Sequence, residues 1–193
     1  EGGMALTNCS NLAEKLEMLR THGITRNSHL MTKEPDGPWY YEQLSLGYNY
    51  RMTDVQAALG LSQMNRLESY VAKRQELAKR YNDLLKDLPI SCPKVGKDCY
   101  SSFHLYVIRL NIDHLSTNHL EVFEYLHSKN ILVNIHYMPV HLQPFYKDLG
   151  FSEGDYPESE KYYKEAISLP LYPNLSYSDQ DYVVDCLKKS LEI

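Results

Sequence analysis

The chain has 193 residues, and its 20 lysines and arginines against 25 aspartates and glutamates give a net charge of −5. This charge argues against a nucleic acid as the main partner, and no apolar run approaches the roughly 18 residues that span a membrane. No segment resembles a signal peptide, and the four cysteines form no CxxC pair, so we expect a cytoplasmic protein without a zinc site or a disulfide framework.

The first predicted helix begins after Ser10 or Asn11, either of which could cap it. Its apolar stripe consists of three leucines at helical spacing: Leu12, Leu16 and Leu19. Gly23 is expected to end the helix in the left-handed conformation. Around that glycine, His22 and Arg26 could form a small cationic patch, although cations that favour a helix C-terminus explain them equally well.

The segment from Ile24 to Met52 has little helical periodicity but much Pro, Gly, Trp and Tyr. A loop of this length inside a compact domain is usually either functional or disordered, and the dense aromatic residues favour an ordered one.

The segment from Leu46 to Ala58 joins this loop to the most clearly signalled helix. Thr53 is a predicted N-cap, Gln56 completes a capping box, and Asp54 stands in the first turn. Just before it, residues 48–51 (YNYR) place an amide, phenols and a guanidinium beside a helix N-terminus, where they could meet an anion such as phosphate. An ordinary capped loop is an equally good interpretation of this pattern.

This helix is expected to run from Thr53 to about Arg66, and its small residues favour close packing against another helix or subunit. A longer amphipathic helix follows, and Pro89 stops it. We interpret residues 67–89 as a connecting helix between residues 1–66 and a separate C-terminal region, residues 90–193.

The C-terminal region is predicted to start with a strand at 103–110, apolar on both faces. Ser116 is the expected cap of the next helix, whose buried stripe would be Leu120, Phe123 and Leu126.

A second strand is predicted at 131–137, with Ile131, Val133 and Ile135 on one face and Asn134 and His136 on the other.

Two histidines and two tyrosines occur between His136 and Tyr146, where this strand ends. His136 and His141 are a poor metal pair at this spacing, so we expect no metal site there. Single histidines most often fill ordinary core or surface positions, but a polar wall of a substrate pocket fits this cluster better.

The last predicted elements are a helix that begins at Pro157, a strand at 167–171, and a final helix. Ser178 is the expected cap of that final helix. Its inward side chains are predicted from their spacing: Val183, Cys186, Leu187 and Leu191.

Several catalytic motifs are missing from the sequence: it has no phosphate loop, no GxGxxG, no HExxH and no GxSxG. Tyrosines outnumber the other aromatic residues, with 17 Tyr against 4 Phe and 1 Trp. Such amphipathic rings suit walls that are half apolar and half wet, including sugar-binding clefts. The residues alone therefore indicate an α/β protein with a polar cleft lined by tyrosine and histidine.

Five segments together resemble the C-terminal half of the DegT/DnrJ/EryC1/StrS sugar aminotransferases. They are residues 1–3 (EGG), 19–26 (LRTHGITR), 47–58 (GYNYRMTDVQAA), 104–109 (HLYVIR) and 139–146 (PVHLQPFY). Within the family, residues 22–26 and 140–144 look most like the UDP-4-amino-4,6-dideoxy-N-acetyl-β-L-altrosamine transaminases of pseudaminic acid synthesis.

The resemblance implies a fold and a cofactor. The fold is the C-terminal part of a fold type I (aspartate aminotransferase-like) homodimer that depends on pyridoxal 5′-phosphate (PLP), with a small α/β domain carrying a short antiparallel sheet. In relatives, the lysine that forms the Schiff base with PLP lies upstream of the segment that matches Glu1–Gly3. The resemblance therefore assigns no catalytic residue to this chain, which we expect to be inactive alone.

The resemblance also implies binding residues. Asn49 matches an asparagine that crosses the dimer interface to the cofactor phosphate, and Arg51 lies beside it. Three residues match the region that lines the nucleotide-sugar pocket: His136, Tyr137 and His141. His22 and Arg26 are candidates for substrate contact across the interface.

The implied reaction is transfer of an amino group from glutamate to C4 of a nucleotide-linked 4-keto-6-deoxy sugar, by the intact protein. Two alternatives stay open. Some relatives replace the lysine with histidine and dehydrate the sugar, and a non-catalytic ligand-binding or interaction fragment would need neither residue.

Overall fold

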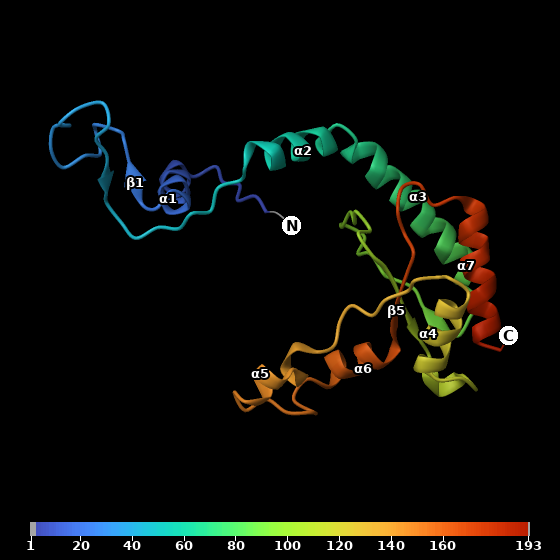
Figure 1. Ribbon diagram of the computed structural model, residues 1–193. Coiled ribbons are helices and arrows are strands. Elements are labelled where there is room, and N and C mark those ends of the chain that lie inside the picture. Colours follow the sequence, from blue (N-terminus) through green and yellow to red (C-terminus); the bar gives the residue numbers. More distant parts are fainter. Residues whose placement is uncertain (1–2, 193) are drawn as a thin grey trace. The chain divides into compact units, whose positions relative to one another are not determined.

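The computed structural model describes residues 3–192, so most of the matching segment Glu1–Gly3 lies outside the described residues. Two compact units divide the chain, the first ending at Asn65 and the second beginning at Arg66 (Figure 1). No helix within the described part of the chain is long and apolar enough to cross a membrane.

In its described residues, 3–65, the first unit contains two helices and one small antiparallel pair of strands. They are α1 (Ser10–Arg20), β1 (Ile24–Thr25), β2 (Glu42–Gln43) and α2 (Asp54–Met64). The expected cap of α1 is wrong: Cys9 holds the N-cap position, where its carbonyl accepts from the amides of Leu12 and Ala13. Gly23 adopts the predicted left-handed conformation at φ +68°, and a Cβ there would lie 1.9 Å from the Ser45 carbonyl oxygen. It does not end the helix itself, because α1 ends at Arg20 with Thr21 as its C-cap.

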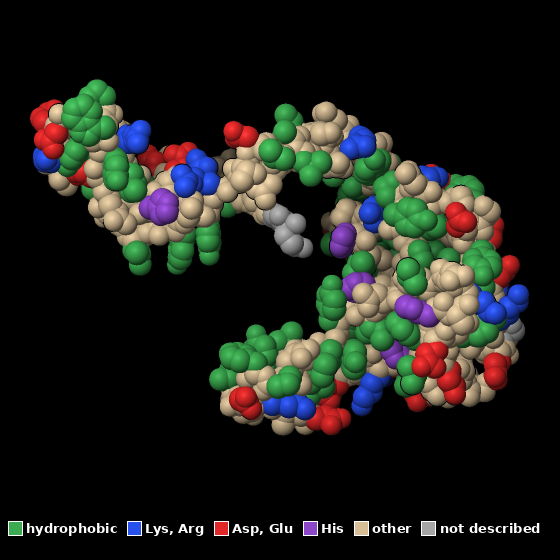
Figure 2. Space-filling view, viewed as in Figure 1, with side chains coloured by type: hydrophobic (Ala, Val, Ile, Leu, Met, Phe, Trp, Pro, Cys, Tyr) green, Lys and Arg blue, Asp and Glu red, His purple; other side chains and the backbone are tan. Residues whose placement is uncertain are grey.

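The capping box of α2 is confirmed. The Thr53 hydroxyl accepts from the Gln56 amide, and the Gln56 side chain accepts from the Thr53 amide at 2.9 Å. Neither α1 nor α2 has a buried residue, and apolar side chains such as Val55 (81% exposed) and Leu61 (70% exposed) lie open to solvent. Figure 2 shows such side chains along α2.

The second unit is a three-stranded antiparallel sheet with helices around it. Its strands are β3 (Ile90–Ser91), β4 (Tyr106–Leu110) and β5 (Ala166–Leu169), in the spatial order β3-β4-β5. Its α-helices are α3 (Leu67–Leu85), α4 (His119–Ser128), α5 (Pro144–Lys147), α6 (Pro157–Glu165) and α7 (Tyr177–Ser190). Two 3-10 turns, η1 (Ile112–His114) and η2 (Val140–Leu142), complete it.

The core of the second unit lies between the sheet and helices α3, α4 and α7. Tyr106, Ile108 and Leu110 of β4 are fully buried, and the Tyr106 ring stacks on Tyr81 of α3 with centroids 4.9 Å apart. On the opposite face of β4, Arg109 pairs with Glu165 of α6 at 2.6 Å. Since residues of a strand alternate between faces, this one strand anchors both layers.

The second half of helix α3 contributes to this core. Its buried residues are Leu77, Ala78, Tyr81 and Leu85. It ends at Leu85, before Pro89. The division of the chain into residues 1–66, 67–89 and 90–193 stays a prediction for the intact protein.

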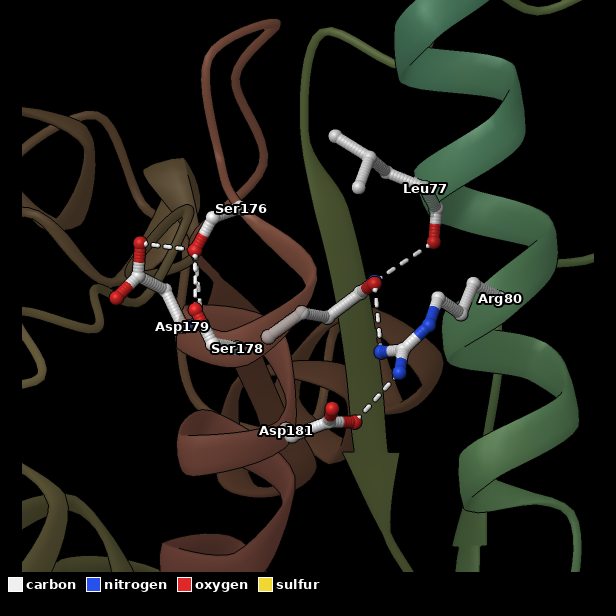
Figure 3. A network of polar contacts seen from close by, with 7 residues as sticks. Leu77, Arg80, Ser176, Ser178, Asp179 and Asp181 are labelled. Atoms are coloured by element: carbon white, nitrogen blue, oxygen red, sulfur yellow. Dashed lines mark hydrogen bonds and ion pairs between the residues drawn. The ribbon is translucent and has the colours of Figure 1, made fainter.

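A polar network joins α3 to α7 (Figure 3). The Gln180 side chain, 0% exposed, donates through Nε2 to the Leu77 carbonyl at 2.8 Å, and its Oε1 accepts from Arg80 at 3.1 Å. Arg80 also pairs with Asp181 at 2.7 Å. The predicted cap Ser178 is wrong, because Ser176 caps α7 by accepting from the Asp179 amide.

Two further details of the second unit correct the predictions. Asn118, rather than Ser116, caps α4 in a capping box with Glu121. Leu120 is 61% exposed, and the buried positions of α4 are Val122 and Leu126.

Strand formation is also narrower than predicted. Residues 131–137 form only an isolated bridge, Asn134 with Ser168, since the Ile131 and Val133 amides bond locally to Leu126 and Ile131. The strand predicted at 103–110 starts only at Tyr106. Before it, the carbonyl groups of Phe103 and His104 accept hydrogen bonds from the Arg74 side chain and not from a neighbouring strand.

Candidate functional site

The loop that carries Asn49 is fixed to the C-terminal end of α1. The Tyr48 amide donates to the Leu19 carbonyl at 2.6 Å, and the Tyr50 amide donates to the Arg20 carbonyl at 3.0 Å. The last carbonyls of a helix lack partners within the helix, and the loop amides supply them. The backbone of Asn49 forms a bridge with Thr21 and is thereby held in place.

The side chains of Asn49 and Arg51 form a surface of hydrogen-bond donors. Arg51 Nε donates to Asn49 Oδ1 at 2.8 Å, and both residues are exposed. Because that bond occupies the amide oxygen, the amide NH₂ and the remaining guanidinium N–H groups are what the pair offers to a ligand. Asp54 lies in the first turn of α2, just after this pair in the sequence.

The rings of Tyr48 and Tyr50 stack beside this pair, with centroids 4.9 Å apart. They line a cavity of about 800 Å³ together with α1 and residues 3–7. The loop therefore combines donors for an anion with an apolar wall.

Of the two cationic candidates in the first unit, His22 lies next to this loop. Its backbone amide donates to the Tyr48 carbonyl at 2.8 Å, and its carbonyl accepts from the Gln43 side chain at 2.9 Å. Arg26 follows β1, and its guanidinium lies over the Tyr41 ring at 5.9 Å. His22 therefore lies beside the loop that carries Asn49, whereas the side chain of Arg26 contacts Tyr41.

In the second unit, His136 and Tyr137 leave the core together. His136 Nδ1 lies 2.7 Å from the hydroxyl of Ser168 on β5, which orients the imidazole. The Tyr137 ring meets the His136 ring edge-on at 4.6 Å and is 72% exposed. His136 is therefore a fixed group at the end of the sheet, and Tyr137 is free to contact a ligand.

His141 is buried and paired with a residue that the sequence analysis missed. Its Nε2 lies 2.8 Å from Glu160 Oε1, and the Gly154 amide donates to the same oxygen at 2.8 Å. The hydrogen bond from His141, together with that from Gly154, holds the pKa of the Glu160 carboxyl below its usual value. Glu160 follows Pro157 in the first turn of α6, where an acidic residue ordinarily faces solvent, so the sequence offered no signal for this pair.

His141 also lines a cavity of about 360 Å³ between η2, α5 and α6. Its other lining residues are mostly aromatic: Val140, Tyr146, Phe151, Tyr156 and Ser159. An imidazole nitrogen in an aromatic wall can bind a flat or ring-shaped polar ligand by stacking and one hydrogen bond.

Comparison with known proteins gives these sites a family context. Residues 1–188 match the model of the DegT/DnrJ/EryC1/StrS aminotransferase family. The chain is 37% identical over 191 residues to the spore coat polysaccharide biosynthesis protein SpsC of Bacillus subtilis, covering 97% of this chain and 49% of that protein.

A second relative carries a substrate in its name. The UDP-4-amino-4,6-dideoxy-N-acetyl-beta-L-altrosamine transaminase of Helicobacter pylori is 33% identical over 194 residues, covering 100% of this chain and 48% of that protein. Among solved structures, the PLP form of Spr1654 from Streptococcus pneumoniae aligns with a TM-score of 0.82 at 27% identity, covering 96% of this chain and 45% of that chain. The chain spans about half the length of the relatives it matches.

Proposed function

The chain belongs to the DegT/DnrJ/EryC1/StrS aminotransferase family, and from that premise we propose that the intact protein moves an amino group from glutamate to C4 of a nucleotide-linked 4-keto-6-deoxy sugar. The match of this whole chain to the altrosamine transaminase supports the choice of substrate. Because the match covers about half of that relative, the activity, substrates and partners are proposed for the protein as a whole.

The loop at residues 48–51 suits the phosphate group of PLP, the cofactor of this family. Asn49 and Arg51 offer only donors, since the one amide oxygen that would repel a phosphate already accepts from Arg51. These two side chains would hold the phosphate. When bound, PLP supplies an electron sink for the carbon that exchanges its amino group.

The second unit would hold the nucleotide sugar. Ser168 fixes the imidazole of His136, Tyr137 presents an exposed phenol, and His141 faces an aromatic cavity. These residues would orient the sugar and shield it from water, and the chemistry of amino transfer would belong to the cofactor.

The partner is proposed to be a second copy of the protein. Helix α2 exposes apolar side chains along its length and buries none within its own chain, which supports a role in a subunit interface. His22 and Arg26 would contact substrate across that interface.

The observation that carries the cofactor assignment is the Arg51–Asn49 hydrogen bond, and PLP affinity in the intact protein tests it. Asn49→Asp would place a carboxylate against the phosphate and is expected to weaken PLP binding by about 1–3 kcal/mol, or roughly fivefold to 150-fold. Asn49→Ala should cost less, because only a hydrogen bond is lost.

Asn11→Asp is the matched control, since it adds the same charge to an exposed position of the first unit. PLP dissociation constants and melting temperatures are measured for each variant. An unchanged PLP affinity in Asn49→Asp would remove Asn49 from the cofactor site. The reaction itself is tested by formation of 2-oxoglutarate from glutamate in the presence of the keto sugar, and loss of water from the sugar without it would contradict amino transfer.

A further inference from the structure

Glu160 makes two hydrogen bonds through a single buried oxygen. Its Oε1 accepts from the Gly154 amide and faces His141 Nε2, each at 2.8 Å. Both side chains of the His141–Glu160 pair are at least nine-tenths buried. The carboxylate therefore joins three parts of the second unit: η2, the turn at Gly154 and α6.

The carboxylate also determines which nitrogen of His141 carries a hydrogen. An ionised carboxylate can only accept, so the hydrogen must lie on Nε2. In the neutral imidazole, Nδ1 is then a hydrogen-bond acceptor. The His141 side chain makes no other hydrogen bond within residues 3–192, and no buried side-chain nitrogen or oxygen there lacks a partner, so Nδ1 is reached by solvent.

The surroundings of His141 suit a neutral ligand. None of the other residues that line its cavity carries a charge: Val140, Tyr146, Phe151, Tyr156 and Ser159. The Tyr156 ring packs on the imidazole with centroids 4.9 Å apart. A carboxylate behind the imidazole disfavours an anion in front of it, whereas aromatic walls favour a ring that bears hydroxyl groups.

Glu160 also fixes the wall of the cavity. Residues 142–153, which we call the arm, begin directly after His141 and end directly before Gly154, and both of these flanking residues bind the same carboxylate oxygen. Tyr146 and Phe151 of the arm line the cavity. Figure 2 shows hydrophobic side chains on this part of the molecule around α5.

We propose that Glu160 is a positioning residue, which holds His141 with Nδ1 as the acceptor and thereby selects a hydroxyl group of the neutral sugar rather than the diphosphate. This inference rests on the proposed function, because it assumes that a nucleotide sugar enters the second unit. Glu160 itself touches no substrate and acts through His141 and the arm.

The imidazole ¹⁵N chemical shifts of the intact protein test the tautomer without any ligand, with His141→Gln to assign the signal. Wild-type protein is expected to show His141 with the hydrogen on Nε2. Glu160→Gln keeps the size of the side chain and an oxygen for Gly154, but an amide can accept or donate, so both tautomers should become populated. Glu165→Gln, at the other buried carboxylate of α6, is the control and should leave the His141 signal unchanged.

A wild-type His141 with a hydrogen on Nδ1, either as the other neutral tautomer or as the doubly protonated imidazolium, would overturn the assignment, even if Glu160→Gln failed to fold. A His141 signal that is the same in Glu160→Gln and in wild type would also overturn it. Loss of stability with an unchanged tautomer would leave Glu160 only a structural role.

Binding of UDP and of UDP-N-acetylglucosamine, measured by calorimetry, tests the selection of the sugar. Glu160→Gln is expected to weaken UDP-N-acetylglucosamine about tenfold, the equivalent of one hydrogen bond, and to leave UDP unchanged. Equal effects on both ligands, or none on either, would refute the selection while leaving the proposed function intact. If wild-type protein bound neither ligand, the proposed function and the sugar assignment would both fail, and the ¹⁵N measurement would still decide the tautomer.

Discussion

Replacing Gln180 with alanine should destabilise the second unit more than any change at the exposed end of the same network. The side chain is 0% exposed and makes two hydrogen bonds, to the Leu77 carbonyl and from Arg80. Each hydrogen bond contributes about 0.5–1.5 kcal/mol to the free energy of unfolding, and loss of the buried methylene group removes about 1 kcal/mol more. The Leu77 carbonyl keeps its bond within α3, and Arg80 keeps Asp181, so the expected loss is about 2–3 kcal/mol.

Asp181→Ala is the matched comparison, because it removes only the outer ion pair. The Asp181 side chain is 50% exposed, and a pair of this kind contributes at most about 1 kcal/mol. Urea unfolding followed by circular dichroism gives both free energies of unfolding. A loss below about 0.5 kcal/mol for Gln180→Ala, or an equal loss for the two variants, would refute the reasoning that burial makes the inner bonds the stronger part.

Three further predictions concern α2 and Glu160. Thr53→Ala removes the cap of α2 and should cost about 1 kcal/mol of local stability, seen as faster hydrogen exchange at 54–58, and Thr53→Ser should restore it. Leu61→Glu, at a position that is 70% exposed, should reduce self-association in light scattering, and unchanged association would count against α2 as an interface. Because its folded pKa is lowered, Glu160 stabilises the protein above the ordinary carboxyl value of 4.5, and this stabilisation is lost as pH falls through the folded pKa. Glu160→Gln should therefore flatten the fall in unfolding free energy below pH 4.5, and an acid limb as steep as that of wild type would argue against it.

Features whose signals lie within four residues of one another could be predicted. The Thr53–Gln56 capping box is one case, and the start of α6 at Pro157 is another. Both depend on contacts that the chain makes with its own next turn, so the local sequence contains all of the information.

The N-caps of α4 and α7 were predicted at the wrong residues, because each helix start has two residues suited to capping that lie two positions apart. Asn118 and Ser176 are the true caps, and both have the extended backbone that an N-cap needs, with ψ of 168° and 158°. Side-chain type alone does not reveal which of two neighbouring candidates the tertiary structure leaves extended. The strand predicted at 131–137 does not form for a related reason. Its apolar and polar residues alternate as in a strand, but whether a neighbouring strand pairs with it depends on distant parts of the chain.

The candidate site likewise has one pair of residues that the local sequence indicates and one pair that it does not. Asn49 and Arg51 are two residues apart, and their pairing follows from the loop that holds them. His141 and Glu160 are nineteen residues apart on different elements, and a glutamate in the first turn of a helix is ordinarily solvated. Only the fold shows that this carboxylate is buried against an imidazole.

The bond between Gln180 and the Leu77 carbonyl has a consequence for the synthesis of the chain. The two residues are separated by 103 positions. At translation rates of about 5–20 residues per second, α3 waits about 5–20 s on the ribosome for the helix that covers it. During that interval the side chains of Leu77, Ala78, Tyr81 and Leu85, all buried in the finished unit, have no α7 against which to pack. The nascent chain therefore presents an amphipathic helix to the ribosome surface and to chaperones before it can complete its own core.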